Sequence, residues 1–194
     1  MTKVETAVDA EMPESGSRND TSLKQGGTAE RSPAADTDAT PGGNPVTSGF
    51  LARLNDPVRF RSTHHARFAE LDPFGHLNTN SYLGYFTENR FIGHRDCLKL
   101  DLKAMMRFGI EPHIRKADLD FIRPVLLDQE FTVESYLSDA SLDACTVPCT
   151  MVNDSGKLLA TCTFHIVCVD KKTRRPCKWP ENFLRLFYHQ LLPE

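Results

Sequence analysis

The sequence predicts an α+β fold, in which a curved antiparallel sheet of about five strands wraps around one long central helix and a short C-terminal helix follows. Apolar residues recur at helical spacing for several turns after residue 78, one strand-like run precedes this segment, and four more follow it. A single long helix followed by consecutive strands is typical of an antiparallel sheet that covers the helix.

The chain divides by composition into a tail and a folded domain. It has 194 residues, 40% of them apolar, and a formal charge of −3. Residues 1–48 contain no Phe, Tyr or Trp and carry more acidic than basic side chains, so they cannot bury enough apolar surface to offset chain entropy. We predict a disordered acidic low-complexity tail over residues 1–48 and one domain over residues 49–194. The near-neutral domain argues against general nucleic-acid binding.

Targeting and metal signals are missing from the sequence. No apolar run approaches the ~20 residues of a membrane-spanning helix, and the first twenty residues are acidic and lack the pattern of a signal peptide. We therefore expect a cytoplasmic protein without a membrane span. The six cysteines form no Cys-x-x-Cys pair and have no His at zinc-ligand spacing. We expect reduced thiols, no metal and no cofactor.

The first half of the domain reads as a strand, a turn and a helix. Residues 58–69 predict a strand, and Asp72-Pro73-Phe74-Gly75 predicts a turn. Asn78 is a good N-cap for the helix. Gly84 and Gly93 are costly inside a helix, which predicts close packing against a broad surface. The expected apolar face of the helix consists of Tyr82, Leu83, Tyr85, Phe86, Phe91 and Ile92.

The second half reads as four strands and a terminal helix. The strands are expected at residues 111–123, 129–137, 142–153 and 158–169. Pro148 lacks the N–H that a ladder needs, so its strand is either an edge there or bulged. The run from Pro180 to Tyr188 predicts a short helix with Pro180 as its first residue.

The turn and the helix start resemble a known family. Asp72-Pro73-Phe74-Gly75, continued by His-Leu-Asn-Thr-Asn-Ser-Tyr to Tyr82, is similar to the motif of the hotdog-fold 4-hydroxybenzoyl-CoA thioesterases in their Gly-His-x-Asn variant. Residues 115–124 and 169–176 are similar to the family's second strand and to the end of its last one. The resemblance covers about residues 58–184. It implies a hotdog domain that hydrolyses acyl-CoA as a homodimer or homotetramer, with its sites at the subunit interface.

The resemblance assigns roles at the motif. Thioester hydrolysis needs a nucleophile or an activated water, together with donors aimed at the oxygen that becomes negative. Asp72 is expected to be the catalytic carboxylate, either as general base or as nucleophile. The Thr79 amide is expected to be the oxyanion donor, and Gly75 lets the backbone approach the substrate. His76 and Asn78 are either catalytic groups or local caps and turn formers.

Substrate binding needs cations, because coenzyme A carries a phosphorylated nucleotide. The candidates are Arg115, Lys116, Arg123, Lys171, Lys172, Arg174 and Arg175. The last four also fit a solvated turn. Tyr82, Phe86 and Phe91 are expected in the core, with one of them lining the acyl channel. Glu88 is expected to be an ordinary solvated or capping carboxylate, although other hotdog branches use a helical Glu.

Three other functions use the same fold. The first is hydrolysis of acyl groups on an acyl carrier protein. The second is binding of acyl-CoA without turnover, against which the intact turn at Asp72 argues. A dehydratase is the third, and it is less favoured because the match is to the thioesterase turn.

Overall fold

The structure is a computed structural model, and it describes residues 44–193. The predicted acidic tail lies outside the described residues up to residue 43. Buried side chains are present just before the predicted domain boundary, because Val46 is buried and helix α1 (Ser48–Arg53) follows directly. Thr47 caps α1 by accepting a hydrogen bond from the amide of Phe50, whose ring is buried.

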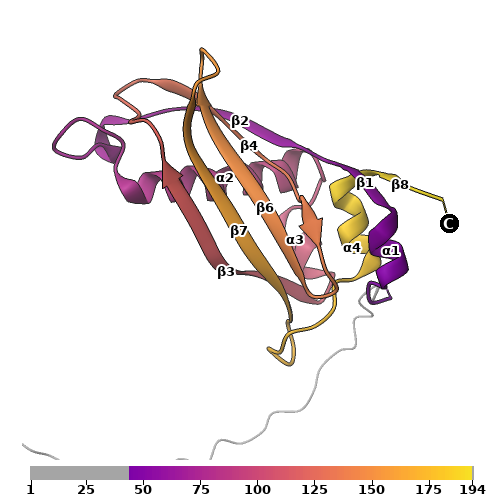
Figure 1. Cartoon of the computed structure of the whole chain (residues 1–194). Coiled ribbons are helices and arrows are strands. Elements are labelled where there is room, and N and C mark those ends of the chain that lie inside the picture. Colours follow the sequence, from indigo (N-terminus) through magenta and orange to yellow (C-terminus); the bar gives the residue numbers. More distant parts are fainter. Residues whose placement is uncertain (1–43, 194) are drawn as a thin grey trace, which may run out of the picture. The chain divides into compact units, whose positions relative to one another are not determined.

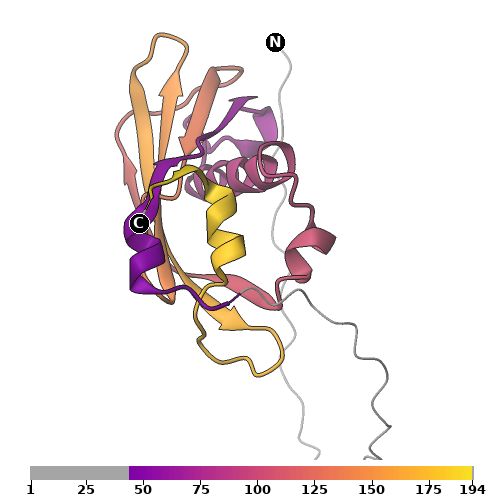
Figure 2. The same cartoon turned by 90° about the vertical axis from the view of Figure 1, so that its right-hand side faces the viewer.

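The predicted α+β fold is confirmed. Strands lie in the order β2, β4, β6, β7 and β3, all neighbours are antiparallel, and the two-residue β5 pairs with β6. The long helix α2 (Thr79–Asp96) packs against one face of this sheet, which curves around it (Figure 1 and Figure 2). The strand bounds are β2 Phe60–His65, β3 Ile110–Phe121, β4 Glu130–Ser135, β5 Asp139–Ala140, β6 Ala144–Asn153 and β7 Leu158–Asp170.

Alternation along the strands builds the core. Every second residue of β4, β6 and much of β7 is buried, as the two-residue period of a strand with one covered face requires. The buried set includes four cysteines, which are Cys145, Cys149, Cys162 and Cys168. All cysteines of residues 44–193 are free. The prediction that these thiols act as small apolar core side chains is therefore confirmed for these positions.

The buried face of α2 is narrower than the predicted one. Its buried residues are Tyr82, Tyr85, Phe86, Asn89, Gly93 and His94. Phe91 is 62% exposed and Leu83 is also exposed, so the prediction that Phe91 lies in the core is wrong.

The two helix glycines behave differently. A Cβ at Gly93 would lie 2.0 Å from Cγ of Phe60, so the helix approaches β2 as closely as the sequence predicted. A Cβ at Gly84 would meet nothing within 4 Å. The predicted close packing is therefore confirmed at Gly93 and wrong at Gly84.

A buried amide ties α2 to the sheet. The side chain of Asn89 is fully buried, donates to the carbonyl of Val133 (3.0 Å) and to Oγ of Ser62 (2.8 Å), and accepts from Oγ of Ser135 (2.6 Å). Because its buried polar atoms are paired, this network fixes the height of the helix over β2 and β4.

The C-terminal segment differs from the prediction. The helix α4 spans only Glu181–Leu184, a 3-10 turn follows over Arg185–Phe187, and Pro180 is the N-cap residue, not the first helical residue. The chain then forms β8 (Tyr188–Leu191), which pairs with β1 (Leu54–Pro57). The C-terminal helix is therefore shorter than predicted, because the chain is extended from Tyr188 onward. The helix α3 (Leu102–Met106) and the 3-10 helix Phe68–Glu70 were also not predicted.

Pro148 lies where its strand is locally an edge. Pairing of β6 with β4 ends at Cys149, and pairing with β5 involves Cys145 and Thr146. No strand therefore faces Pro148 on that side within residues 44–193, which explains why its missing N–H is tolerated. Over the same residues, no helix is both long and apolar enough to cross a membrane.

Candidate active site

The turn at Asp72 is held by backbone hydrogen bonds. Oδ1 of Asp72 accepts from the amides of Phe74 (2.9 Å) and His76 (3.0 Å), and the Asp72 carbonyl accepts from the amide of Gly75 (3.0 Å). Gly75 has φ +79°, a conformation that a side chain would strain. The second oxygen, Oδ2, has no hydrogen-bond partner among residues 44–193 and is left for a substrate or water.

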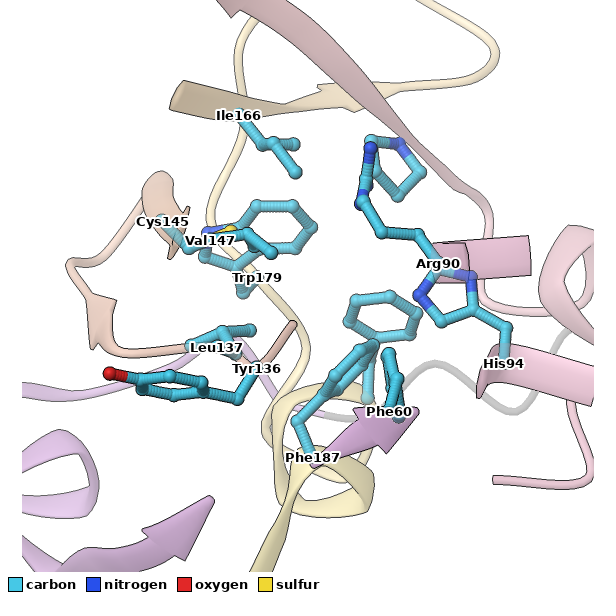
Figure 3. Close-up of a pocket in the computed structure, with 12 residues that line it drawn as sticks. Phe60, Arg90, His94, Tyr136, Leu137, Cys145, Val147, Ile166, Trp179 and Phe187 are labelled. Atoms are coloured by element: carbon cyan, nitrogen blue, oxygen red, sulfur yellow. The ribbon is translucent and has the colours of Figure 1, made fainter. Parts of the chain in front are cut away.

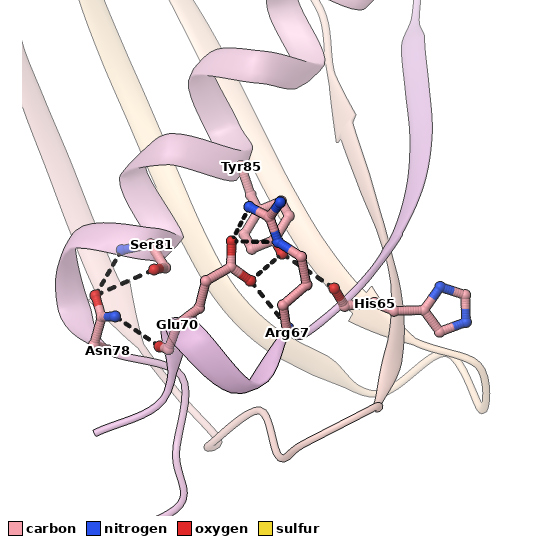
Figure 4. A network of polar contacts seen from close by, with 6 residues as sticks. All are labelled: His65, Arg67, Glu70, Asn78, Ser81 and Tyr85. Carbon is pink, nitrogen blue, oxygen red and sulfur yellow. Dashed lines mark hydrogen bonds and ion pairs between the residues drawn. The ribbon is translucent and has the colours of Figure 1, made fainter. Parts of the chain in front are cut away.

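The start of α2 is fixed against this turn by Asn78. Its Oδ1 accepts from the Ser81 amide (3.0 Å), which confirms the predicted N-cap, and its Nδ2 donates to the Glu70 carbonyl (2.6 Å) (Figure 4). The amides of Thr79 and Asn80 at the first turn have no acceptor within the described part of the chain. They carry the positive end of the helix dipole.

The turn and the helix start open onto one groove of about 270 Å³. Five of the predicted site residues line it: Asp72, His76, Thr79, Tyr82 and Arg123. Phe121, Ile122 and Pro124, at and just beyond the end of β3, supply apolar surface. Asp72 with its free carboxylate oxygen, Thr79 with its free amide and an apolar wall therefore line one groove.

Two groove residues are anchored by hydrogen bonds. The Tyr82 hydroxyl accepts from the Val125 amide (3.3 Å), its ring packs edge-on against Phe121 at 5.0 Å, and burial raises the pKa of the hydroxyl. Arg123 donates from Nη1 to the Leu158 carbonyl (2.6 Å). The guanidinium thus stays at the groove edge with donors to spare.

The other two cations that were predicted to bind the substrate, Arg115 and Lys171, do not line the groove. Arg115 is the extra residue of a β-bulge in β3 and lines a separate hollow with His165. Lys171 donates its amide to the Gly109 carbonyl, at the opposite end of β3 from Phe121. A strand of that length spans on the order of 35 Å. A single subunit therefore does not bring either residue to the groove.

Two of the four remaining cationic candidates are paired locally. Lys116 forms an ion pair with Asp118 (2.8 Å), and Arg174 forms one with Glu111. Glu88 is exposed in a hollow between α2 and α3, away from the groove. This position fits the ordinary solvated carboxylate that the sequence predicted.

A carboxylate that the sequence analysis gave no role joins the turn to the helix. Glu70 accepts from the Tyr85 hydroxyl (2.5 Å) and from Nε (3.0 Å) and Nη2 (2.5 Å) of Arg67 (Figure 4). Burial raises the pKa of Glu70, but the hydrogen bonds from Arg67 and Tyr85 outweigh it and lower this pKa to about 2. Burial and the Glu70 hydrogen bond raise the pKa of Tyr85 to about 12.

Glu70 is therefore ionised and connects the 3-10 helix Phe68–Glu70 to α2. Its side chain reaches Tyr85 in the second turn of α2, and its carbonyl accepts from the Asn78 amide (2.8 Å). The signal in the sequence was the Arg67 to Glu70 spacing, which lets the Glu70 carboxylate accept from both the amide and the guanidinium of Arg67 across a 3-10 turn. Its functional meaning depends on Tyr85, fifteen residues away, which no local pattern connects to it.

Comparison with known proteins gives one family and several related folds. The model of the thioesterase-like superfamily matches residues 66–187. No curated protein matches the chain. A Staphylococcus aureus protein solved in complex with CoA superposes with a TM-score of 0.63 at 19% identity, covering 72% of this chain and 89% of that one.

Two solved thioesterases are similar in the same way. A 1,4-dihydroxy-2-naphthoyl-CoA thioesterase from Synechocystis gives a TM-score of 0.60 at 20% identity, covering 67% of this chain and 96% of that one. A DHNA-CoA thioesterase from Staphylococcus aureus gives a TM-score of 0.56 at 18% identity, covering 62% of this chain and 80% of that one. At these identities the likeness concerns the fold. The family match includes the turn at Asp72, all of α2 and the groove.

Proposed function

We propose, from the premise that the chain belongs to the thioesterase-like superfamily, that it hydrolyses an acyl-CoA thioester to a free carboxylic acid and CoA. The observation that carries this proposal is that one groove is lined both by Asp72, whose Oδ2 has no partner among residues 44–193, and by Thr79, whose amide has no acceptor there. Thioester hydrolysis needs these two functions side by side.

Asp72 supplies the carboxylate of the reaction. As general base, it removes a proton from water while the water oxygen attacks the carbonyl carbon. As nucleophile, it forms an acyl–carboxylate anhydride that water then cleaves. Both routes end with the C–S bond broken, the acid and the CoA thiol released, and one water consumed. The hydrogen bonds that Oδ1 accepts from two backbone amides hold the side chain in place and leave Oδ2 for the substrate.

The helix start stabilises the developing charge. The thioester oxygen becomes negative as the carbonyl carbon turns tetrahedral, and the Thr79 amide donates to it with the helix dipole behind it. Gly75 keeps the turn free of a Cβ where the substrate passes. Asn78 positions Thr79 by capping, and His76 orients the water or Asp72.

The groove also supplies contacts for the substrate. Tyr82 and Phe121 offer an aromatic wall for the acyl group or the adjacent pantetheine arm, and Arg123 offers donors for a CoA phosphate. Arg115 and Lys171 would reach a CoA molecule only from a second subunit. Their proposed role in substrate binding therefore depends on assembly.

We infer a homodimer or homotetramer with the groove at the interface. Phe74 on the turn is 83% exposed, and Phe121 and Ile122 beside the groove are also exposed, so a single subunit leaves apolar surface around the site. The outer edge of β3 pairs with no other strand of residues 44–193. Light scattering of the purified chain tests this, because a monomer at assay concentration contradicts it.

The cytoplasm is the proposed compartment. Four of the free thiols are buried and unpaired, which is the usual state of cysteines in a reducing environment. Fractionation of the native source tests this directly. Recovery in a secreted fraction would contradict it.

The activity test compares the chain with two matched variants on a panel of acyl-CoAs. Asp72→Asn keeps an oxygen that can accept from Phe74 and His76 but removes the charge, so we expect a turnover loss of ~100-fold or more with folding intact. Asp120→Asn removes an exposed carboxylate of β3 outside the groove, and we expect full activity from it. Equal activity of both variants contradicts the proposal.

The same assay separates the alternatives. Faster release from an acyl carrier protein than from CoA would identify a carrier-protein thioesterase. Tight binding of acyl-CoA, with no thiol released from either CoA or carrier-protein substrates, would identify a binding protein.

A further inference from the structure

Two cysteines face each other where the chain leaves β7 and returns toward α4. Cys168 lies near the end of β7, and Cys177 lies on the returning segment. Their Sγ atoms are 3.4 Å apart, and the Cys177 amide donates to the Cys168 carbonyl (3.0 Å). Sulfur atoms at this distance are in contact, so the two thiols form a pair at one site.

The backbone places the two cysteines directly opposite each other. Their neighbours Val169 and Pro176 form an antiparallel bridge. Opposite residues of an antiparallel pair have Cα atoms about 4.5–5.5 Å apart, and disulfides join Cα atoms about 4.4–6.8 Å apart. Because an S–S bond is about 2 Å long, the two sulfur atoms need to approach by about 1.4 Å. Rotation of the side chains supplies this approach without a shift of the backbone.

The turn that joins the two thiols is fixed by Asp170. Its Oδ1 accepts from the amides of Thr173 (2.6 Å) and Lys172 (3.0 Å). These hydrogen bonds lower the pKa of Asp170, so the carboxylate is ionised and the turn keeps its shape at neutral pH. The thiols are therefore held together before any bond links them.

One thiol of the pair is accessible and the other is not. Cys168 is fully buried, and burial raises the pKa of its thiol above the usual range, whereas Cys177 is partly exposed. Cys177 lines an open hollow of about 680 Å³, whose lining includes the lysines Lys171, Lys172 and Lys178. A dissolved oxidant therefore reaches Cys177 first, and the lysines attract an oxidant that carries negative charge.

From this arrangement we infer that Cys177 and Cys168 are a site of reversible oxidation, with Cys177 as the reacting thiol and Cys168 as the resolving thiol. A hydroperoxide transfers one oxygen to the sulfur of Cys177, its O–O bond breaks, and water or an alcohol leaves. The sulfur of Cys168 then displaces the hydroxyl group of the sulfenic acid, the S–S bond forms, and one water is released. The pair loses two electrons and two protons, which the hydroperoxide gains.

The other cysteines lack one of the two features that define this site. Cys149 and Cys162 lie opposite each other across β6 and β7, but both are buried. Cys97 is exposed, but no other thiol lies within hydrogen-bonding distance of it in the described part of the chain. Contact with a second thiol and access from solvent thus coincide at Cys177.

The bond would tie the segment that carries Trp179 to the sheet. Trp179 lies two positions beyond Cys177, and its buried ring stacks on Phe183 with 5.6 Å between ring centroids. It shares the wall of a small apolar cavity with Val147 and Ile166 (Figure 3). A disulfide at Cys177 restricts the unfolded chain at this point, so the oxidised protein should be the more stable form.

This inference is independent of the proposed hydrolysis. The Lys171 amide, on the turn between the two cysteines, donates to the Gly109 carbonyl at the opposite end of β3 from the groove. Neither cysteine lines the groove. Hydrolysis at Asp72 and oxidation at Cys177 can therefore fail separately.

Peptide mapping of the full chain tests the site directly. Trypsin and chymotrypsin together cleave on both sides of Cys168 and between it and Cys177, so only a disulfide joins the two peptides. After treatment with hydrogen peroxide and alkylation of the remaining thiols, we expect these peptides to be linked, and dithiothreitol should separate them. Cys149 and Cys162 should be unlinked. Oxidation of Cys177 without a link to Cys168, or an equally fast link between Cys149 and Cys162, would overturn the inference.

Thermal unfolding provides a matched test with two variants. The bond closes a loop of about ten residues, so Tm of the oxidised chain should be about 5–10 °C above that of the chain kept in dithiothreitol. Cys177→Ser should lose this rise, and Cys97→Ser, which removes an exposed thiol elsewhere, should keep it. Equal rises in both variants would overturn the inference. If Cys177→Ser fails to fold, the peptide map of the unaltered chain decides.

Discussion

Replacing Glu70 by Gln tests whether this carboxylate holds the turn at Asp72 against α2. The variant keeps the shape of the side chain but removes the charge that accepts from Arg67 and Tyr85. Charge-assisted hydrogen bonds contribute about twice as much as neutral ones. We therefore expect a stable fold with a weaker link between the turn and the helix.

The magnitude follows from the pKa of Glu70. A folded-state pKa of about 2 against an ordinary value of 4.5 corresponds to ~3.4 kcal/mol. This is an upper bound, because the Arg67 side chain is 77% exposed and solvent screens its charge. We expect Glu70→Gln to lower the free energy of unfolding by about 1.5–2 kcal/mol at pH 7, and Tm by about 3–8 °C.

The sign of the pH dependence is fixed by the direction of the pKa. Folding lowers the pKa of Glu70, so its contribution is fully present above pH 4.5 and is lost as pH falls toward 2. By pH 3, less than half of the difference between the wild type and Glu70→Gln should remain. The assay is urea unfolding at both pH values.

The control for this experiment is Glu88→Gln, which removes an exposed carboxylate from α2. We expect it to change the free energy of unfolding by less than about 0.5 kcal/mol at either pH. A difference between wild type and Glu70→Gln that is as large at pH 3 as at pH 7 would refute the reasoning. So would a Glu70→Gln variant as stable as the wild type at pH 7.

The remaining predictions concern the helix. Gly93→Ala should destabilise the fold by about 1–3 kcal/mol, because its Cβ would overlap Phe60, whereas Gly84→Ala should stabilise it by up to ~1 kcal/mol; equal effects in thermal unfolding would contradict the packing described. Asn78→Ala should cost about 1 kcal/mol through the lost cap. It should also lower kcat by releasing the Thr79 amide, and an unchanged kcat would mean that the cap does not position the oxyanion donor.

Local patterns in the sequence were enough for the central architecture. Asn78 was identifiable as a cap because a short polar side chain precedes a long helical periodicity, and the strand periods placed β3, β4, β6 and β7 within a few residues. The turn at Asp72 could be identified because Pro73 restricts the backbone there and Gly75 permits the positive φ that the turn needs. These features depend on neighbours within a few positions along the chain.

Features that depend on distant partners could not be predicted in the same way. Strands β1 and β8 are four residues each and lie more than 130 positions apart, so neither carries a readable pattern. Phe91 is as apolar as Phe86, and only the sheet decides which of them is covered. The role of Glu70 depends on Tyr85, fifteen residues away, which only the folded chain brings to it.

The most direct test of the central assignment is a crystal structure with a non-hydrolysable acyl-CoA analogue, in which a methylene group replaces the thioester sulfur. We predict that the carbonyl oxygen lies about 2.7–3.1 Å from the Thr79 amide, and that the Asp72 carboxylate faces the carbonyl carbon or a water beside it. An analogue bound with its carbonyl away from Thr79 and Asp72 would contradict the assignment of the active site.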